Sequence, residues 1–257
     1  MGKIIAITNQ KGGVGKTTTS VNLAASLAAL KQRVLLVDLD PQGNAAMGCG
    51  VDKHDIQYSS YDLLMETVSA VETVINLPNV KFDVIAGNAD LTAAEVELMK
   101  ADRKELRLSN ALATIKSDYD YIIIDCPPSL NMLTLNAMVA ANSLLIPMQC
   151  EYYALEGISA LIATFKSIQS TVNSGLHLEG VLRTMFDDRN RLTKDVSEEL
   201  IRHFGNKVFK SCIPRNIRVA EAPSHGLPVL NYDKNSKGAV TYMTLAKEIL
   251  ANAANGN

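Results

Sequence analysis

Eight residues near the start of the chain, KGGVGKTT at positions 11–18, have the composition of a phosphate-binding loop. They follow a short apolar run, residues 4–7, that predicts a β-strand, and they precede a helical pattern. Glycines let backbone N–H groups turn towards an anion, and the start of the helix adds positive charge. We therefore expect the loop to bind nucleotide phosphates, with Lys16 near the β- and γ-phosphates and Thr17 as a Mg²⁺ ligand. The predicted phosphate-binding residues are Gly12, Gly13, Val14, Gly15, Lys16, Thr17 and Thr18.

A second lysine, Lys11, opens the same loop. Such a residue is often only a solvated loop charge. KGGVGKTT, however, resembles the deviant Walker A motif of the ParA/MinD family of ATPases, in which the first lysine reaches across a dimer interface to the partner's nucleotide. The resemblance implies that Lys11 binds ATP in trans, that it acts with Lys16 in catalysis, and that the ATP-bound chain forms a homodimer.

Two acids, Asp38 and Asp40, follow the second predicted strand, residues 33–38. They could simply end the strand in a turn. Beside a phosphate-binding loop, however, carboxylates at this edge of a sheet can hold a Mg²⁺-bound water or orient the attacking water. By resemblance to the family's switch I segment, Asp40 is expected to contact the nucleotide and act in hydrolysis, and Asp38 to support the Mg²⁺ shell through water.

A further acid, Asp125, ends an apolar run at residues 121–125, which predicts a buried strand with a carboxylate near the water shell of Mg²⁺. The alternative is an acid that only ends the strand. Residues 125–129 also resemble the family's switch II. The nitrogenase iron protein, a relative, holds a cluster with cysteines at its dimer interface, but Cys126 has no second cysteine in a matching segment. We expect Cys126 to be a small buried residue.

Three later segments, residues 147–157, 213–218 and 221–226, resemble the chromosomal ParA, or Soj, branch of the family. The resemblance implies that Pro214 and Asn216 frame the adenine, and it leaves the role of Glu151 open. The guanine signature Asn-Lys-x-Asp is absent, which leaves ATP as the expected nucleotide, with Mg²⁺.

Basic residues outnumber acidic ones by nine to five between residues 180 and 220, although the whole chain has a formal charge of −2. A solvated helical face is the ordinary explanation. Family resemblance implies instead that the ATP-bound dimer binds double-stranded DNA without sequence preference, which favours a local basic patch. Arg189 and Arg218 are the preferred DNA contacts because they lie in matching segments; Arg191, Lys194 and Lys210 are weaker candidates.

Seven apolar runs alternate with helical patterns along the chain. This order predicts an α/β P-loop NTPase fold, a mostly parallel twisted sheet with helices on both faces. We expect one domain over residues 1–257, with a frayed tail at about 251–257. The four cysteines form no C-x-x-C pair, no apolar run approaches the roughly 20 residues of a membrane span, and no signal peptide is expected. The seven runs cover residues 4–8, 33–38, 82–85, 121–125, 144–148, 180–185 and 208–213.

The resemblance, which covers essentially the whole chain, implies a cytoplasmic, nucleoid-associated DNA-partitioning ATPase whose hydrolysis is stimulated by a ParB-type, Spo0J-like, partner. A MinD-like membrane-associated ATPase is the main alternative. It requires a C-terminal amphipathic helix with a basic face, whereas residues 244–257 contain a single basic residue, Lys247, and many alanines. A metabolic ATP-dependent ligase resembling dethiobiotin synthetase would need a pocket for a small acid, of which the sequence gives no sign. No stable membrane association is expected.

Overall fold

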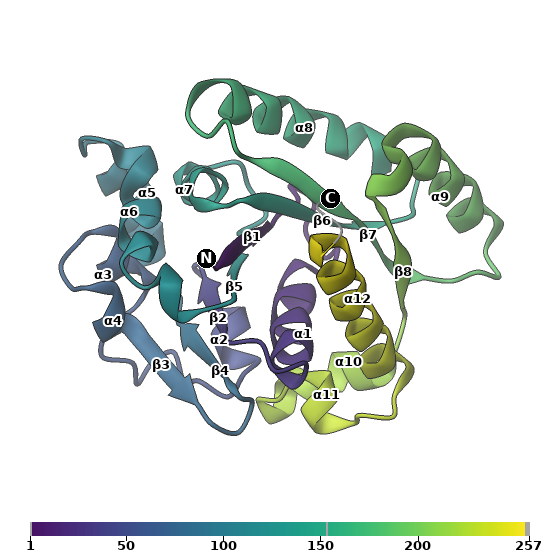
Figure 1. The fold of residues 1–257 in the computed structure, drawn as a ribbon, viewed down its shortest axis with the longest axis horizontal. Coiled ribbons are helices and arrows are strands. Elements are labelled where there is room, and N and C mark those ends of the chain that lie inside the picture. The colour runs from purple at the N-terminus through teal and green to yellow at the C-terminus, as the bar shows by residue number, and fades with distance from the viewer. Residues whose placement is uncertain (1, 153, 255–257) are drawn as a thin grey trace.

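A computed structural model describes residues 2–152 and 154–254 of the chain. The strands form one eight-stranded sheet in the order β3-β4-β2-β5-β1-β6-β7-β8 (Figure 1). Its strands are β1 (Lys3–Ile7), β2 (Val34–Asp38), β3 (Val74–Leu77), β4 (Phe82–Ile85), β5 (Tyr121–Asp125), β6 (Ser143–Gln149), β7 (His177–Phe186) and β8 (Val208–Pro214). The helices are α1 (Lys16–Ala29), α2 (Asn44–Met47), α3 (Ser60–Leu64), α4 (Ala70–Thr73), α5 (Leu91–Leu98), α6 (Arg107–Ala113), α7 (Met132–Ala140), α8 (Ala154–Thr171), α9 (Arg191–Phe204), α10 (Ile217–Glu221), α11 (Val229–Tyr232) and α12 (Lys237–Ala254).

Side chains alternate between the two faces of the sheet, and each face has its own apolar core. Ile4 and Ala6 of β1 join the core beneath α3 and α5 to α9, whereas Ile5 and Ile7 join the core beneath α1 and α12. Figure 1 shows α8 and α9 on the opposite side of the sheet from α1 and α12. The predicted fold, a mostly parallel sheet with helices on both faces, is therefore confirmed.

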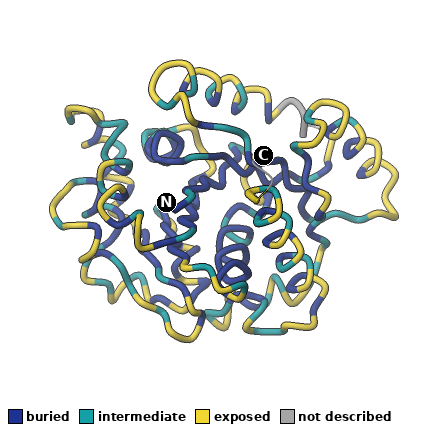
Figure 2. The backbone as a smooth tube through the Cα atoms, in the orientation of Figure 1, coloured by how far each residue is buried: buried dark blue, intermediate teal, exposed yellow. Residues whose placement is uncertain are grey.

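Helix α1 leads from the end of the phosphate loop across the sheet. Most residues of α1 are small, and nearly all of its length is buried (Figure 2). The helix packs against the sheet and against α12. Such close packing fixes the start of the helix relative to the ends of β1 and β5. The loop that precedes it is therefore held on a rigid support.

Strand β3 is the one strand of the described chain that the sequence does not predict. It pairs antiparallel with β4 through a short turn at residues 78–81, and most of its residues are only partly buried. A short edge strand needs neither a long apolar run nor a crossover helix, so it leaves little pattern in the sequence. At the other end of the chain, α12 continues to Ala254; residues 255–257 of the predicted tail lie outside the described residues.

Candidate nucleotide site

The phosphate loop joins β1 to α1 through glycines with positive φ. Gly13 has φ 72° and Gly15 has φ 86°, a region in which a Cβ would be strained. Gly15 is the N-cap of α1, and no side chain caps the helix there. The first N–H groups of α1 thus remain available to an anion, as a phosphate site requires.

Lys16 is buried at the mouth of this loop, with 6% of its surface exposed. Its ammonium donates to the Lys11 backbone carbonyl at 3.1 Å. Burial lowers the Lys16 pKa, and the nearby carboxylates of Asp125 and Asp40 oppose that shift. Lys16 is therefore placed to bind an anion from inside the loop.

Lys11 faces the outside of the loop instead. Its ammonium forms an ion pair with Glu151 at 2.6 Å, and the two side chains are 43% and 48% exposed. The Lys11 backbone N–H donates to the Asn9 side chain at 3.0 Å. The two lysines of the motif thus differ in environment: Lys16 is enclosed and Lys11 is accessible to a second molecule.

The predicted acids Asp38 and Asp125 meet at the carboxyl ends of neighbouring parallel strands. They are register partners in β2 and β5, and both are fully buried. Burial raises the pKa of both carboxyls, and the charge of Asp38 raises that of Asp125 further. A cation at this edge would offset the cost of holding two carboxylates together.

Magnesium fits the oxygen groups that the structure gathers around Asp125. The Ser20 hydroxyl donates to Asp125 Oδ1 at 2.7 Å, and Ser20 and Thr17 both oppose the rise in the Asp125 pKa. Asp125 Oδ2 is buried and has no hydrogen-bond partner among the described residues. A Mg²⁺-bound water would satisfy that oxygen, and carboxylate and hydroxyl oxygens are the donors that Mg²⁺ prefers.

Both carboxylate oxygens of Asp38 accept hydrogen bonds, unlike those of Asp125, and one of these bonds comes from the backbone of Asp40. Asp38 Oδ1 accepts the Asp40 N–H at 3.1 Å, and Asp38 Oδ2 accepts the Ala46 N–H at 3.0 Å. Asp40 Oδ1 accepts the Gln42 N–H at 2.9 Å. Asp40 is therefore a mostly buried carboxylate with a fixed backbone beside the loop.

Pro214 and Asn216 line a pocket of about 390 Å³ that opens beside Gly15 and Thr18 of the phosphate loop. The Asn216 side-chain oxygen caps α10 by accepting the Val219 N–H at 3.2 Å. Two segments that are far apart in sequence thus form one concave surface. Its size and mostly apolar lining suit a planar base.

Several residues at this site carry no clear signal in the sequence. The Thr184 hydroxyl, from the end of β7, donates to the Val14 carbonyl of the loop at 2.8 Å. Met185 lines the pocket and has φ 49°, which is unusual for a non-glycine residue. Ser20 lies one helical turn after Lys16, so both residues are on the same side of α1. This spacing is the signal by which the sequence could have identified Ser20 as a site residue.

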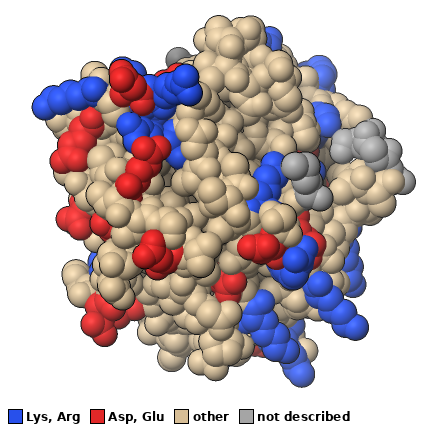
Figure 3. Space-filling model, turned by 60° about the vertical axis from the view of Figure 1, so that its left-hand side comes forward, with Lys and Arg blue, Asp and Glu red and all other residues tan. Residues whose placement is uncertain are grey.

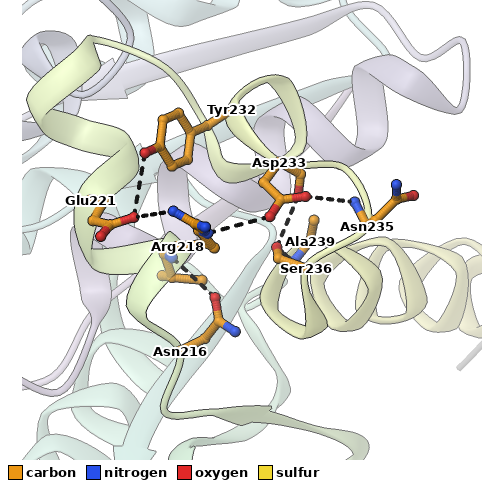
Figure 4. A network of polar contacts seen from close by, with 9 residues as sticks. Asn216, Arg218, Glu221, Tyr232, Asp233, Asn235, Ser236 and Ala239 are labelled. Atoms are coloured by element: carbon orange, nitrogen blue, oxygen red, sulfur yellow. Dashed lines mark hydrogen bonds and ion pairs between the residues drawn. The ribbon is translucent and has the colours of Figure 1, made fainter.

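The two predicted DNA-contacting arginines both lie on the surface, in ion pairs with nearby acids. Arg189 pairs with Asp187 at 2.8 Å and its side chain is 87% exposed. Arg218 lies between Glu221, at 2.9 Å, and Asp233, at 3.5 Å (Figure 4). Neither arginine forms an ion pair with Asp38 or Asp125. Both therefore lie outside the candidate phosphate site.

The basic stretch does not lie wholly on the surface. Arg183 is buried, where it donates to the Ser197 hydroxyl at 2.8 Å and the Phe209 carbonyl at 2.7 Å. Arg191 lies 3.9 Å from Asp195 and is almost fully exposed. On the face drawn in Figure 3, acidic side chains lie mainly on the left-hand side and several basic side chains gather at the lower right. Of Arg183 and Arg191, only Arg191 is accessible to another molecule.

Cys126 is completely buried, and burial raises its thiol pKa well above the ordinary value. Within the described ranges, no three His, Cys, Asp or Glu side chains come together as a metal-binding group. The segment 147–157 that resembles the Soj branch includes Tyr153, which lies outside the described residues.

Comparisons with known proteins agree with this geometry. The family model described as AAA domain matches residues 2–178. The chain is 53% identical over 252 residues to the sporulation initiation inhibitor protein Soj of Bacillus subtilis, covering 98% of this chain and 100% of Soj. It is 48% identical over 251 residues to the chromosome partitioning protein ParA of Myxococcus xanthus, covering 97% and 88% of the two chains.

Among solved structures, the chain resembles cobyrinic acid a,c-diamide synthase from Mycobacterium smegmatis with bound ATP analogue and magnesium. The TM-score is 0.87 at 33% identity, covering 100% of this chain and 98% of the other. The higher identities to Soj and ParA extend over almost the entire length. The chain belongs to the ParA/MinD family of P-loop ATPases, in its chromosomal ParA, or Soj, branch.

Proposed function

We propose that this chain is a DNA-partitioning ATPase that switches between a monomer and an ATP-bound homodimer. The observation that carries the proposal is the contrast between the two lysines of one loop. Lys16 is enclosed and serves its own nucleotide, whereas Lys11 points outward with nearly half of its side chain exposed. An outward lysine at the mouth of a phosphate site is suited to reach a nucleotide bound by a second copy.

Within one protomer, Gly12 to Thr18 would cradle the phosphates and Lys16 would neutralise their charge. Thr17 would ligate Mg²⁺ directly, and Asp125 would hold a water of its shell. Bound Mg²⁺ supplies charge neutralisation for phosphoryl transfer. Asp40, whose backbone is fixed by Asp38, would orient the attacking water. The structural relative that binds an ATP analogue and magnesium supports this choice of substrate and cation.

The Asn216 amide at the pocket beside Pro214 suits the adenine of ATP. The Asn216 oxygen is used to cap α10, and no described residue accepts a hydrogen bond from the amide N–H groups of Asn216. The N1 position of adenine accepts a hydrogen bond, whereas N1 of guanine donates one. A free amide donor therefore suits ATP.

DNA binding would follow dimerisation, because two copies double the number of phosphates that cations can contact. Arg189 and Arg218 are the proposed contacts, and each would exchange a local carboxylate for a DNA phosphate. A ParB-type, Spo0J-like, partner would stimulate hydrolysis and release the dimer from the nucleoid. The names of the Soj and ParA relatives support the chromosome-partitioning role.

The membrane alternative finds little support in the C-terminal helix. The apolar residues of α12, including Tyr242, Leu245 and Ile249, are buried in the core against α1 and β8. No helix in the described part of the chain is long and apolar enough to cross a membrane. The apolar face that a membrane would need is thus already used within the fold.

Co-sedimentation with DNA and with anionic liposomes, each with ATP or ADP, tests the proposal. We expect ATP-dependent binding to DNA of any sequence, and ATP hydrolysis that rises when DNA and a basic N-terminal peptide of a ParB-type protein are both added. Binding to liposomes but not to DNA would favour the membrane alternative. ATP consumption that depends on a small carboxylic acid would favour a ligase.

A further inference from the structure

Glu151 holds the outward lysine of the phosphate loop within its own chain. The Glu151 carboxylate lies 2.6 Å from Lys11 Nζ. This ion pair joins the loop after β1 to the segment after β6, across 140 residues of sequence. In this geometry the Lys11 ammonium is occupied in cis, so it must leave Glu151 before it can reach a second chain.

The Glu151 segment is itself anchored to the phosphate loop. Gln149, two residues earlier, donates to the Gly13 carbonyl at 3.4 Å, and the Glu151 N–H donates to the Gln149 carbonyl at 2.9 Å. The Asn9 side chain donates to the Pro147 carbonyl at 2.8 Å. The segment that carries Glu151 is thus held beside the phosphate loop by two side-chain-to-backbone hydrogen bonds and one backbone hydrogen bond.

The two lysines are also coupled to each other. The Lys16 ammonium donates to the Lys11 carbonyl, and the Lys11 ammonium pairs with Glu151. A nucleotide phosphate would compete for the Lys16 ammonium, because a charged acceptor binds it more strongly than a carbonyl does. The Lys11 backbone would then lose one of the contacts that fix it beside Glu151.

We propose that Glu151 is a positioning residue that retains Lys11 in cis and so opposes dimerisation until the chain's own site has bound ATP. The inference rests on the proposed function, since it assumes that Lys11 acts in trans. Glu151 and the nucleotide of the partner chain would compete for the same ammonium. A chain with an empty site would keep Lys11 paired, and binding of ATP at Lys16 would favour its release.

The Lys11–Glu151 ion pair should have a modest effect on the release of Lys11 in one chain and a larger effect on the dissociation constant of the dimer. A half-exposed ion pair changes an equilibrium by a factor of about 1.4 to 5. Because both chains must release Lys11, the effect on the dimer dissociation constant is squared. Removing the Glu151 charge should therefore lower that constant by about 2-fold to 30-fold.

The test compares Glu151→Gln with wild type by light scattering in a non-hydrolysable ATP analogue with Mg²⁺. We expect the variant to dimerise at lower protein concentration, while ADP gives no dimer of either protein. Since exposed charge pairs are screened by salt, the difference should shrink between about 0.05 M and about 1 M salt. Glu151→Asp, which restores the charge, should return the constant towards the wild-type value.

A matched control is Glu198→Gln. Glu198 is an exposed glutamate of α9, outside the phosphate site, so this change removes the same charge without affecting Lys11. If Glu151→Gln dimerises no more readily than Glu198→Gln, Glu151 does not retain Lys11. Weaker dimerisation of Glu151→Gln would also overturn the inference, because it would place Glu151 in the assembled interface. A wild type that never dimerises with the ATP analogue would instead contradict the proposed function itself.

Discussion

Identical residue types have different contacts in the candidate site because their surroundings differ. Burial encloses Lys16 and lowers its pKa, whereas Lys11 lies in a half-exposed ion pair. Asp38 uses both oxygens to fix the backbone around it, whereas Asp125 keeps one oxygen without a partner among the described residues. Asp40 is the remaining acid, and the proposed function gives it the attacking water.

Asp40→Ala should preserve ATP binding and slow hydrolysis by about 100-fold or more, because a positioned carboxylate contributes that much to general base chemistry. The ATP dimer should then persist on DNA. Single-turnover hydrolysis and dissociation from immobilised DNA measure the two effects. Turnover at the wild-type rate would remove Asp40 from the reaction.

The loop glycines, Lys16, Asp38 and Asp125 stand at recognisable spacings in the sequence, and the structure brings them together at the candidate phosphate site; their roles stay predictions. Thr184 and Met185 could not be predicted as site residues. Thr184 reaches the loop through a contact with Val14, 170 residues earlier. Met185 is placed by an unusual backbone angle. Neither feature leaves a local pattern in the sequence.

At the scale of elements, the parallel sheet separates the nucleotide site from a second polar cluster at the opposite strand ends. Glu179 of β7 accepts from Lys3 Nζ of β1 at 2.8 Å and from the Ser143 hydroxyl of β6 at 2.6 Å. It also lies 3.7 Å from His177 Nε2. One buried carboxylate thus links three neighbouring strands.

This cluster predicts a pH dependence of stability. Burial alone would raise the Glu179 pKa, but hydrogen bonds from His177, Lys3 and Ser143 outweigh it and lower the pKa from 4.5 to about 2. A lowered pKa stabilises the folded state above about pH 4.5, and this contribution is lost as the pH falls towards 2. Its full size is on the order of 3 kcal/mol.

Glu179→Gln should therefore reduce the free energy of unfolding at pH 7, and the difference from wild type should narrow below about pH 4.5. Denaturant unfolding at several pH values measures this. Glu198→Gln, at an exposed site, serves as the control and should have little effect. A difference that stays constant down to the acid limit would show that the Glu179 charge is not responsible.

The seven predicted strands are found at this scale because each is an apolar run with a helix or loop of suitable length after it. Strand β3 could not be predicted, since its four residues lie at the sheet edge and pair locally with β4. The pocket beside Pro214 could be inferred only through family resemblance. Its walls come from α1, β7, β8, α10 and α12, and only the fold brings these elements together.

At the scale of the whole molecule, the proposed function depends on a surface that one chain cannot complete. Gly12 is informative here, because a Cβ built on it has no neighbour within 4 Å among the described atoms. A larger residue is thus accommodated by the single chain. A second chain close to the phosphate loop would meet it directly.

Gly12→Val should leave folding and ATP binding close to those of wild type and block the ATP-dependent dimer. Nucleotide titration and light scattering measure the two properties. Gly175→Val is a suitable control because Gly175 is exposed and lies outside the phosphate loop. Should Gly12→Val still dimerise with ATP, the loops of two chains would not approach closely.

Reversing both surface arginines, Arg189→Glu with Arg218→Glu, should weaken DNA binding by about 10-fold or more for every sequence and lower the salt dependence of binding. Fluorescence anisotropy with two unrelated duplexes at several salt concentrations measures both. Arg33→Glu is the control: Arg33 is also exposed and ion-paired, with Asp120 at 2.9 Å, but it precedes β2, which β5, β1 and β6 separate from β7 and β8 in the sheet. Equal losses for Arg33→Glu would indicate a general charge effect.

The central claim is that Lys11 of one chain serves the nucleotide of another, and a mixing experiment tests it most directly. Lys16→Ala lacks its own nucleotide site and Lys11→Ala lacks the outward lysine, so each alone should hydrolyse little ATP. In a mixed dimer, the Lys11→Ala chain binds ATP and the Lys16→Ala chain supplies Lys11. We predict that mixing the two variants with DNA restores ATP hydrolysis above the sum of the separate activities. A mixture no more active than that sum would contradict a site shared between two chains.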